Sequence, residues 1–323
     1  MIAAKLFSTS VDSPGKEPLI GSSRHVGRPQ AGANSGTEGS AALDGHGPPD
    51  PAIILAAVRG DVQETLRMAW IDPALDAAAA SPVFFTAAWS AIRPNVGKSF
   101  LNLCRTLRAE AVDAVRSAVD SPPDLRKELE EQFSDGELRQ IEETARAAHL
   151  GTAKTQVVVH ALHRAIRGDR IAGTGGEEPP VRRGIPDWQR WLAFQPTPDA
   201  ATATLDDARA ALGLASTPSA LRLMARWPTV LSSAWAELKS TTRRDLWKTG
   251  TGKLRRMVLA GVSTLPHPID LQWTALKARG FRDDDRVELS DRLAAYDLDM
   301  PVHTLVAAFL WIAFGSPEVG SES

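Results

Sequence analysis

The stretch SPVFFTAAWSAIRPN occupies residues 81–95, and WPTVLSSAWAELKST occupies residues 227–241, 146 residues later. Shared alanines are common among helices, but a proline and a tryptophan repeated at equal spacing indicate an internal duplication. Comparison without gaps of residues 64–95 with 210–241 gives the identities Leu66/Leu212, Ala69/Ala215, Ala74/Ala220, Leu75/Leu221, Ala79/Ala225, Pro82/Pro228, Ala88/Ala234 and Trp89/Trp235.

A second pair of similar segments follows in the same order, residues 132–149 and 280–297. A chance match is the alternative to duplication. Duplication predicts two helical repeats, residues 51–170 and 201–315, related as a pseudo-dimer about a pseudo-twofold axis. Such a pairing predicts a pocket between the repeats.

The hydrophobic pattern of both repeats is helical. Apolar residues recur three and four positions apart, as in Ile54, Val58, Val62 and Leu66. Ser134 has the residue type and the following acids of a helix N-cap. Strand alternation is absent, and the β-prone Val157–Val159 run is short and has helical flanks. The predicted fold class is therefore all-α.

Three segments lie outside the predicted repeats. Residues 1–50 are rich in Gly, Ser and Pro and predict a disordered tail, since they offer little apolar surface to bury. Residues 171–200 form a Pro/Gly linker, and its Trp188 and Trp191 indicate that it lies against the protein. Residues 316–323 form a second tail.

Composition excludes several classes of protein. The net charge of −2 gives no general attraction to nucleic acid or anionic membranes, and the single Cys104 excludes an intramolecular disulfide. No apolar run reaches 18 residues, and Val302–Phe314 predicts a buried terminal helix. The N-terminus does not resemble a signal peptide, so the cytoplasm is the expected location.

Two further motifs have an ordinary explanation. His160 and His163 lie at i, i+3, a spacing that can bind a metal ion, but no third ligand at suitable spacing is visible, so no metal site is predicted. The basic segment 239–256 lacks the spacing of a phosphate-binding loop and predicts a solvated helix face.

Several motifs, taken in order, resemble the group I (D,L-) 2-haloacid dehalogenases. The resemblance covers about residues 55–315 and rests on order and spacing more than on any single motif. It is carried by LRMAW at 66–70, Ser81-Pro82, AAW at 87–89, SDGELRQI at 134–141, GTAK at 151–154 and ARWP at 225–228.

This resemblance implies an all-α pseudo-dimer of two fused repeats that hydrolyses both stereoisomers of small 2-haloalkanoic acids. It implies no cofactor. In the family an aspartate, assisted by an asparagine, activates a water molecule that displaces halide from C2 without an ester intermediate. The chemistry is general-base catalysis with in-line positioning.

The matching positions differ from the family pattern at the reacting groups. Ala220 stands where the family has its aspartate, after the retained Ser219, and Thr152 stands where it has its asparagine. Trp70 keeps a pocket tryptophan, and Pro73 replaces a pocket phenylalanine. Trp70, Pro73, Ser219 and Ala220 are accordingly the expected substrate-binding positions.

Asp72 is the hypothesised replacement for the missing base. In the repeat alignment it pairs with Pro218, so it could enter the pocket from the opposite half. The competing interpretation is a helix N-cap before Pro73. Thr152 could orient a water molecule through its hydroxyl, and His149 is a second candidate base.

Two function classes therefore stay open. The first is a divergent, cofactor-independent hydrolase of a small (halo)carboxylic acid, with Asp72, Thr152 and His149 as candidate catalytic residues. The alternative is a non-catalytic small-molecule binding or scaffold protein on the same fold. Either class implies a small carboxylic acid ligand, no nucleic-acid or membrane partner, and leaves a homodimer open.

Overall fold

The computed structural model describes residues 50–119, 123–171, 173–179, 181–242 and 245–315. By its internal contacts the chain divides after Ala57, and the described residues from Val58 onward form one compact unit. The predicted tails, residues 1–49 and 316–323, lie outside the described residues. Asp50 alone of the first tail is described, and its carboxylate accepts a hydrogen bond from the Ala52 backbone at 2.8 Å.

Helices are the regular elements of the described residues, which confirms the all-α prediction. The one exception is an isolated antiparallel bridge between Ile171 and Ile269. The elements are α2 (Pro51–Leu66), α3 (Pro73–Ala79), α4 (Pro82–Ile92), η1 (Arg93–Asn95), α5 (Lys98–Ala118), α6 (Leu125–Leu129), α7 (Asp135–Arg167), η2 (Asp187–Gln189), α8 (Asp199–Leu212), α9 (Ser219–Met224), α10 (Pro228–Thr241), α11 (Asp245–Val262), α12 (Trp273–Ala278) and α13 (Asp283–Ala313).

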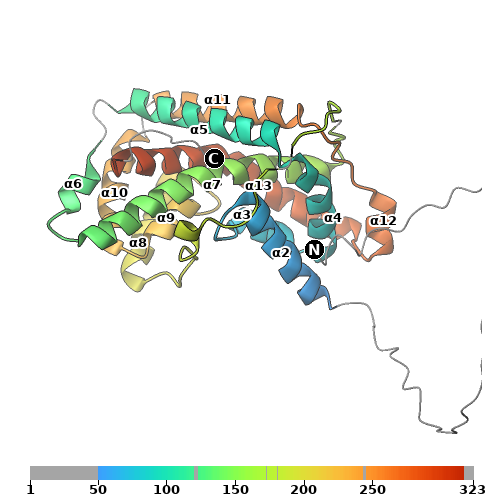
Figure 1. Ribbon diagram of the computed structural model, residues 1–323, viewed down its shortest axis with the longest axis horizontal. Coiled ribbons are helices and arrows are strands. Elements are labelled where there is room, and N and C mark those ends of the chain that lie inside the picture. Colours follow the sequence, from blue (N-terminus) through green and yellow to red (C-terminus); the bar gives the residue numbers. More distant parts are fainter. Residues whose placement is uncertain (1–49, 120–122, 172, 180, 243–244, 316–323) are drawn as a thin grey trace, which may run out of the picture. The chain divides into compact units, whose positions relative to one another are not determined.

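The long helices α7 and α13 lie side by side at the centre of this arrangement (Figure 1). They run antiparallel, because contacts of early α7 residues fall late in α13. His149 stacks on Trp311 with ring centroids 5.6 Å apart, and Gln156 accepts a 2.7 Å hydrogen bond from Thr304. At the other end, Arg286 donates to the carbonyl of Ile166 at 2.8 Å.

The sequence explains where α7 begins and ends. Ser134 and Glu137 form a reciprocal capping box at its start, which confirms the predicted N-cap. Gly168 ends it with φ +84°, a left-handed conformation that glycine adopts without strain. Val157–Val159 lies fully buried inside the helix, so tertiary packing overrides its β-propensity.

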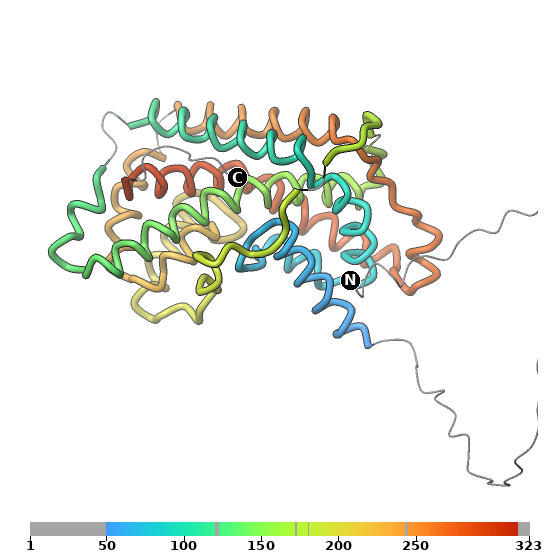
Figure 2. Tube along the Cα trace, viewed as in Figure 1, coloured from blue at the N-terminus to red at the C-terminus, as the bar shows by residue number. Residues whose placement is uncertain are grey.

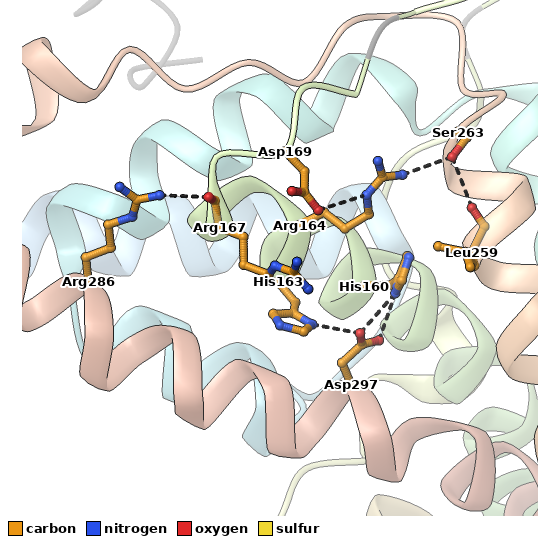
Figure 3. Close-up of polar contacts among 9 residues, drawn as sticks. All are labelled: His160, His163, Arg164, Arg167, Asp169, Leu259, Ser263, Arg286 and Asp297. Atoms are coloured by element: carbon orange, nitrogen blue, oxygen red, sulfur yellow. Dashed lines mark hydrogen bonds and ion pairs between the residues drawn. The ribbon is translucent and has the colours of Figure 1, made fainter.

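A polar cluster joins the two central helices (Figure 3). Nδ1 of His160 and Nδ1 of His163 lie 3.0 and 2.8 Å from the carboxylate of Asp297, on α13. Burial raises the pKa of Asp297, but the hydrogen bonds of the two histidines outweigh it and bring that pKa to about 2. Within the described residues, no three His, Cys, Asp or Glu side chains are grouped so that they could hold a metal ion.

Replacing Asp297 should weaken the central helix pair. The substitution Asp297→Asn removes the charge that both histidines contact, and we expect a loss of about 1.5–3 kcal/mol in unfolding free energy at pH 7. Urea unfolding followed by circular dichroism measures it. Asp291→Asn, on an exposed position of the same helix, is the matched control. Equal stability of the two variants would contradict the assigned role.

The shorter helices pack around this pair. Figure 2 shows α5 and α11 side by side along it. Their close approach depends on Gly261, where an added Cβ would lie 2.4 Å from the Leu103 side chain. The short helices α3 and α9 both pack against α7 and α13. Residues from the two halves of the chain therefore meet on the same two central helices.

Polar contacts recur at the spacing of the predicted repeat. The Trp89 indole donates to Asp61 at 2.7 Å, and the Trp235 indole donates to Asp207 at 2.6 Å. A basic side chain pairs with each aspartate at 2.8 Å, Arg93 in the first half and Lys239 in the second. The helix order is also the same, with α2–α7 matched by α8–α13. The two-repeat organisation stays a prediction, and these correspondences support it.

The linker and the last helix complete the description. In the predicted linker, Trp188 lies under the Arg146 guanidinium at 4.9 Å, and Trp191 meets Trp227 edge-on at 6.4 Å.

Length and hydropathy would let α13 cross a membrane, and the bent pair formed by α3 with α4 and η1 passes the same test only as a broken span. In α13, 67% of the apolar window that passes this test is buried in the protein.

Candidate functional site

Asp72 lies at the start of α3 with its carboxylate buried. Its Oδ1 accepts a hydrogen bond from the Ala74 backbone at 3.0 Å, and Pro73 occupies the first helical position. This is the N-cap geometry that the sequence offered as one interpretation. A cap uses one carboxylate oxygen, so the second oxygen remains for another contact.

That second oxygen reaches the other half of the chain. Asp72 Oδ2 accepts a hydrogen bond from the Ser219 hydroxyl at 2.5 Å, and both residues are almost completely buried. Ser219 is the first residue of α9, and Ala220 follows it, also buried. A carboxylate from the first half therefore lies beside the position where the resemblance implied an aspartate.

Three ionisable residues of α13, Tyr296, Asp299 and His303, interact electrostatically with Asp72 or with one another, and sequence reasoning missed them. Burial lowers the pKa of His303, although the nearby charges of Asp72 and Asp299 act in the opposite direction. Burial and the charge of Asp72 raise the pKa of Tyr296. Asp299 accepts hydrogen bonds from the Ala215 and Ser216 backbones at 2.9 and 3.2 Å. At neutral pH a neutral imidazole and a protonated phenol therefore lie near Asp72 and Asp299.

Trp70 lies against α7, and Thr152 is a buried residue of that helix. The Trp70 indole covers Gly151 so closely that an added Cβ would lie 2.7 Å from it, which explains a glycine inside this helix. The indole Nε1 has no hydrogen-bond partner within the described residues. The Thr152 hydroxyl donates to the Ala148 carbonyl at 2.7 Å and keeps its lone pairs for accepting.

His149 is buried between α7 and α13. Burial lowers its pKa to about 3, and the neighbouring Arg108 lowers it in the same direction. Neither ring nitrogen has a hydrogen-bond partner in the part of the chain that the structure describes. The imidazole is neutral at pH 7 and stacks on Trp311, and among the described residues no hydrogen bond joins it to the Asp72–Ser219 pair.

The low pKa of His149 predicts a pH dependence of stability. The unfolded chain takes up a proton below about pH 6.5 and the folded chain does not until about pH 3, so stability falls as the pH drops through this window. Between pH 7 and pH 5 this one group costs about 2 kcal/mol. Urea unfolding of the His149→Phe variant should show that much less difference between the two pH values than wild type.

The Trp311→Phe variant is the control, because it alters the same stack but keeps the buried imidazole. It should retain the pH dependence of the wild type. An unchanged pH dependence in His149→Phe would contradict the assignment.

The predicted site residues thus fall into two groups. The structure brings together Asp72, Pro73, Ser219 and Ala220 at the junction of α3 and α9. Thr152, His149 and Trp70 lie on or against α7, which packs on both short helices. Tyr296 was the signal available in the sequence for the α13 contribution, because it is the single tyrosine of the chain.

No protein-family model matches the chain. The chain is 22% identical over 218 residues, 65% of its length, to an (R)-2-haloacid dehalogenase of Rhizobium sp. (strain NHG3), of which 83% is covered. It is 22% identical over 284 residues, 83% of its length, to a configuration-inverting 2-haloacid dehalogenase of Pseudomonas sp. (strain 113), of which 90% is covered.

Solved structures show the same fold. A D-2-haloacid dehalogenase mutant in complex with D-2-CPA matches with a TM-score of 0.73 at 18% identity, over 80% of this chain and 91% of that one. A complex of D-2-haloacid dehalogenase with L-LA matches with a TM-score of 0.73 at 18% identity, over 80% and 92% of the two chains. At this identity the likeness shows the fold, which is that of 2-haloacid dehalogenases.

Proposed function

We propose that the protein is a hydrolase of small 2-halocarboxylic acids in which Asp72 is the general base. The observation that carries the proposal is the Asp72–Ser219 contact, which sets a buried carboxylate beside Ala220. The similar proteins named as 2-haloacid dehalogenases support the substrate class. The cytoplasmic location and the homodimer stay predictions.

The site suits a base that is held before the substrate arrives. Both Asp72 oxygens have fixed donors, the Ala74 amide and the Ser219 hydroxyl, so the carboxylate has one orientation. Each oxygen retains a lone pair that can accept a water proton. The cap and the base are therefore compatible roles of one side chain.

The proposed step is a direct displacement. Asp72 accepts a proton from a water molecule, the water oxygen forms a bond to C2, and the carbon–halogen bond breaks with its electron pair leaving on the halide. The products are a 2-hydroxy acid, halide and protonated Asp72. The chemistry needs general-base catalysis and positioning, and the proposal assigns no cofactor to it. Thr152 is the proposed acceptor that orients the water molecule.

The Asp72→Asn variant separates the base from the cap. Asparagine caps helices about as well as aspartate but cannot take the proton, so we expect halide release to fall by about 10²-fold or more with little loss of stability. The assay is halide release from both enantiomers of 2-chloropropionate and 2-bromopropionate. Both enantiomers are assayed because the family resemblance implies hydrolysis of both. The similar proteins, in contrast, are named for (R)- or D-acids or for inversion of configuration.

Asp76→Asn, an exposed aspartate of the same helix, is the matched control and should keep wild-type turnover. Unchanged turnover in Asp72→Asn would exclude Asp72 as the base. An inactive wild type together with an active Ala220→Asp, Thr152→Asn variant would favour the alternative function, a binding protein whose pocket lacks a base.

Direct attack by water has a stereochemical consequence. Displacement at C2 inverts the centre, so (R)-2-chloropropionate should give (S)-lactate. A single turnover in H₂¹⁸O should place the label in lactate. Chiral chromatography with mass spectrometry measures both results. Label in the protein instead of the product would indicate a covalent ester, a route that also inverts C2. Retention of configuration would indicate two displacements at C2. Either result would contradict the proposed step.

A further inference from the structure

A basic cleft lies along a different face of α7 from the one that packs on α13. A cleft of about 650 Å³ opens between α7, the residue after α2 and the linker. Its charged lining is almost entirely basic, although the chain as a whole carries a net charge of −2. The lining includes six basic residues and one acid, Asp187; the basic residues are Arg67, Arg146, Lys154, Arg182, Arg183 and Arg190.

Part of this positive charge is already neutralised. Arg183 pairs with Asp61 at 2.5 Å, and Arg190 pairs with Asp187 at 2.8 Å. Arg67, Arg146 and Arg182 make no ion pair with any described residue, while Arg146 stacks on Trp188. Three guanidinium groups without a counter-charge therefore line one concave surface, where low-dielectric walls strengthen their field.

Arg67 occupies a backbone position that suits glycine. It follows the last residue of α2 with φ +56°, and the next amide, of Met68, donates to Gln63 O at 2.9 Å. This is the helix ending in which a left-handed residue, usually glycine, follows the helix. The corresponding residue after α8 is Gly213, with φ +66°, followed by the matching Leu214 N to Arg209 O bond. The first half of the chain thus holds a strained arginine where the second half has glycine.

Two residues that line the cleft also carry buried polar atoms without hydrogen-bond partners among the described residues. Arg67 Nε is buried and makes no hydrogen bond in the described part of the chain. Gln189 lines the cleft, is 3% exposed, and its side-chain oxygen has no partner there. Buried polar atoms normally have partners, and backbone strain tends to concentrate at functional sites. Both observations point to a ligand that the cleft is built to hold.

The cleft does not belong to the candidate active site. Its α7 lining is Arg146, Leu150 and Lys154, which share one helix face. His149 and Gln156 face α13 instead, through Trp311 and Thr304. A ligand in the cleft therefore contacts a surface separate from Asp72 and Ser219.

We propose that this cleft binds a small organic molecule that carries phosphate or diphosphate groups. Guanidinium groups match the oxygen pairs of phosphate, and three unpaired positive charges fit a ligand with at least two negative charges better than a monocarboxylate. The volume is in the range of pockets that hold cofactor-sized molecules and far exceeds a three-carbon acid.

Calorimetric titration of the full chain with pyrophosphate, at constant ionic strength, tests the proposal. We expect one saturable site, with weaker binding of inorganic phosphate and tricarballylate. The Arg67→Gly and Arg182→Ala variants should each lose about tenfold or more in affinity. Arg67→Gly should also melt at a higher temperature, because glycine relieves the backbone strain. Arg255→Ala, an exposed arginine on α11, is the matched control and should bind as wild type.

Three results would contradict the proposed phosphate site. Absence of saturable binding at millimolar pyrophosphate would overturn the site, as would equal losses in Arg255→Ala, which indicate general charge screening. Tighter binding of tricarballylate than of pyrophosphate would overturn the phosphate assignment. The result is independent of halide release, so failure of the proposed hydrolase function would leave it unchanged.

Discussion

The antiparallel pairing of α7 and α13 is the constraint on which the rest of this structure depends. Its interface combines apolar burial with polar contacts at intervals along its length, from the His149–Trp311 stack through Gln156–Thr304 to Asp297 with its two histidines. Buried polar pairs of this kind fix the register of two helices, since a shift would leave each group without a partner. The short helices α3 and α9 both pack on this pair. The contact between Asp72 and Ser219 therefore exists because one rigid interface holds both helices.

The sequence predicted the framework better than the site. Equal spacing of Trp89 and Trp235 was visible in the sequence, and it reflects a local requirement: each indole donates to an aspartate 28 positions earlier. Local patterns also predicted the Ser134 cap and the helical class. The partners contributed by α13 could not be predicted, because Asp297, Tyr296 and His303 meet their neighbours only across more than 130 positions of sequence or through electrostatic proximity.

Asp72 illustrates why a local and a distant role need not exclude one another. From the sequence, an N-cap and a relocated base were competing interpretations. In the structure the cap occupies one oxygen and Ser219 the other, and the contact with Ser219 depends on the fold alone. A short helix with a buried cap holds a carboxylate in one orientation, because the helix N-terminus supplies a hydrogen-bond donor.

The two halves of the chain differ at the residue that follows the first helix of each half, and this difference is informative. After α8 the chain ends the helix with Gly213, the unstrained solution, so the backbone geometry itself does not require a side chain there. After α2 the same geometry carries Arg67, which costs conformational energy and leaves a buried nitrogen without a hydrogen-bond partner among the described residues. Arginine is unfavourable at this helix end, and its counterpart is glycine. The presence of Arg67 therefore requires an explanation from outside its own helix. The basic cleft supplies one, because a phosphate bound by the Arg67 guanidinium would offset the strain that the free chain bears.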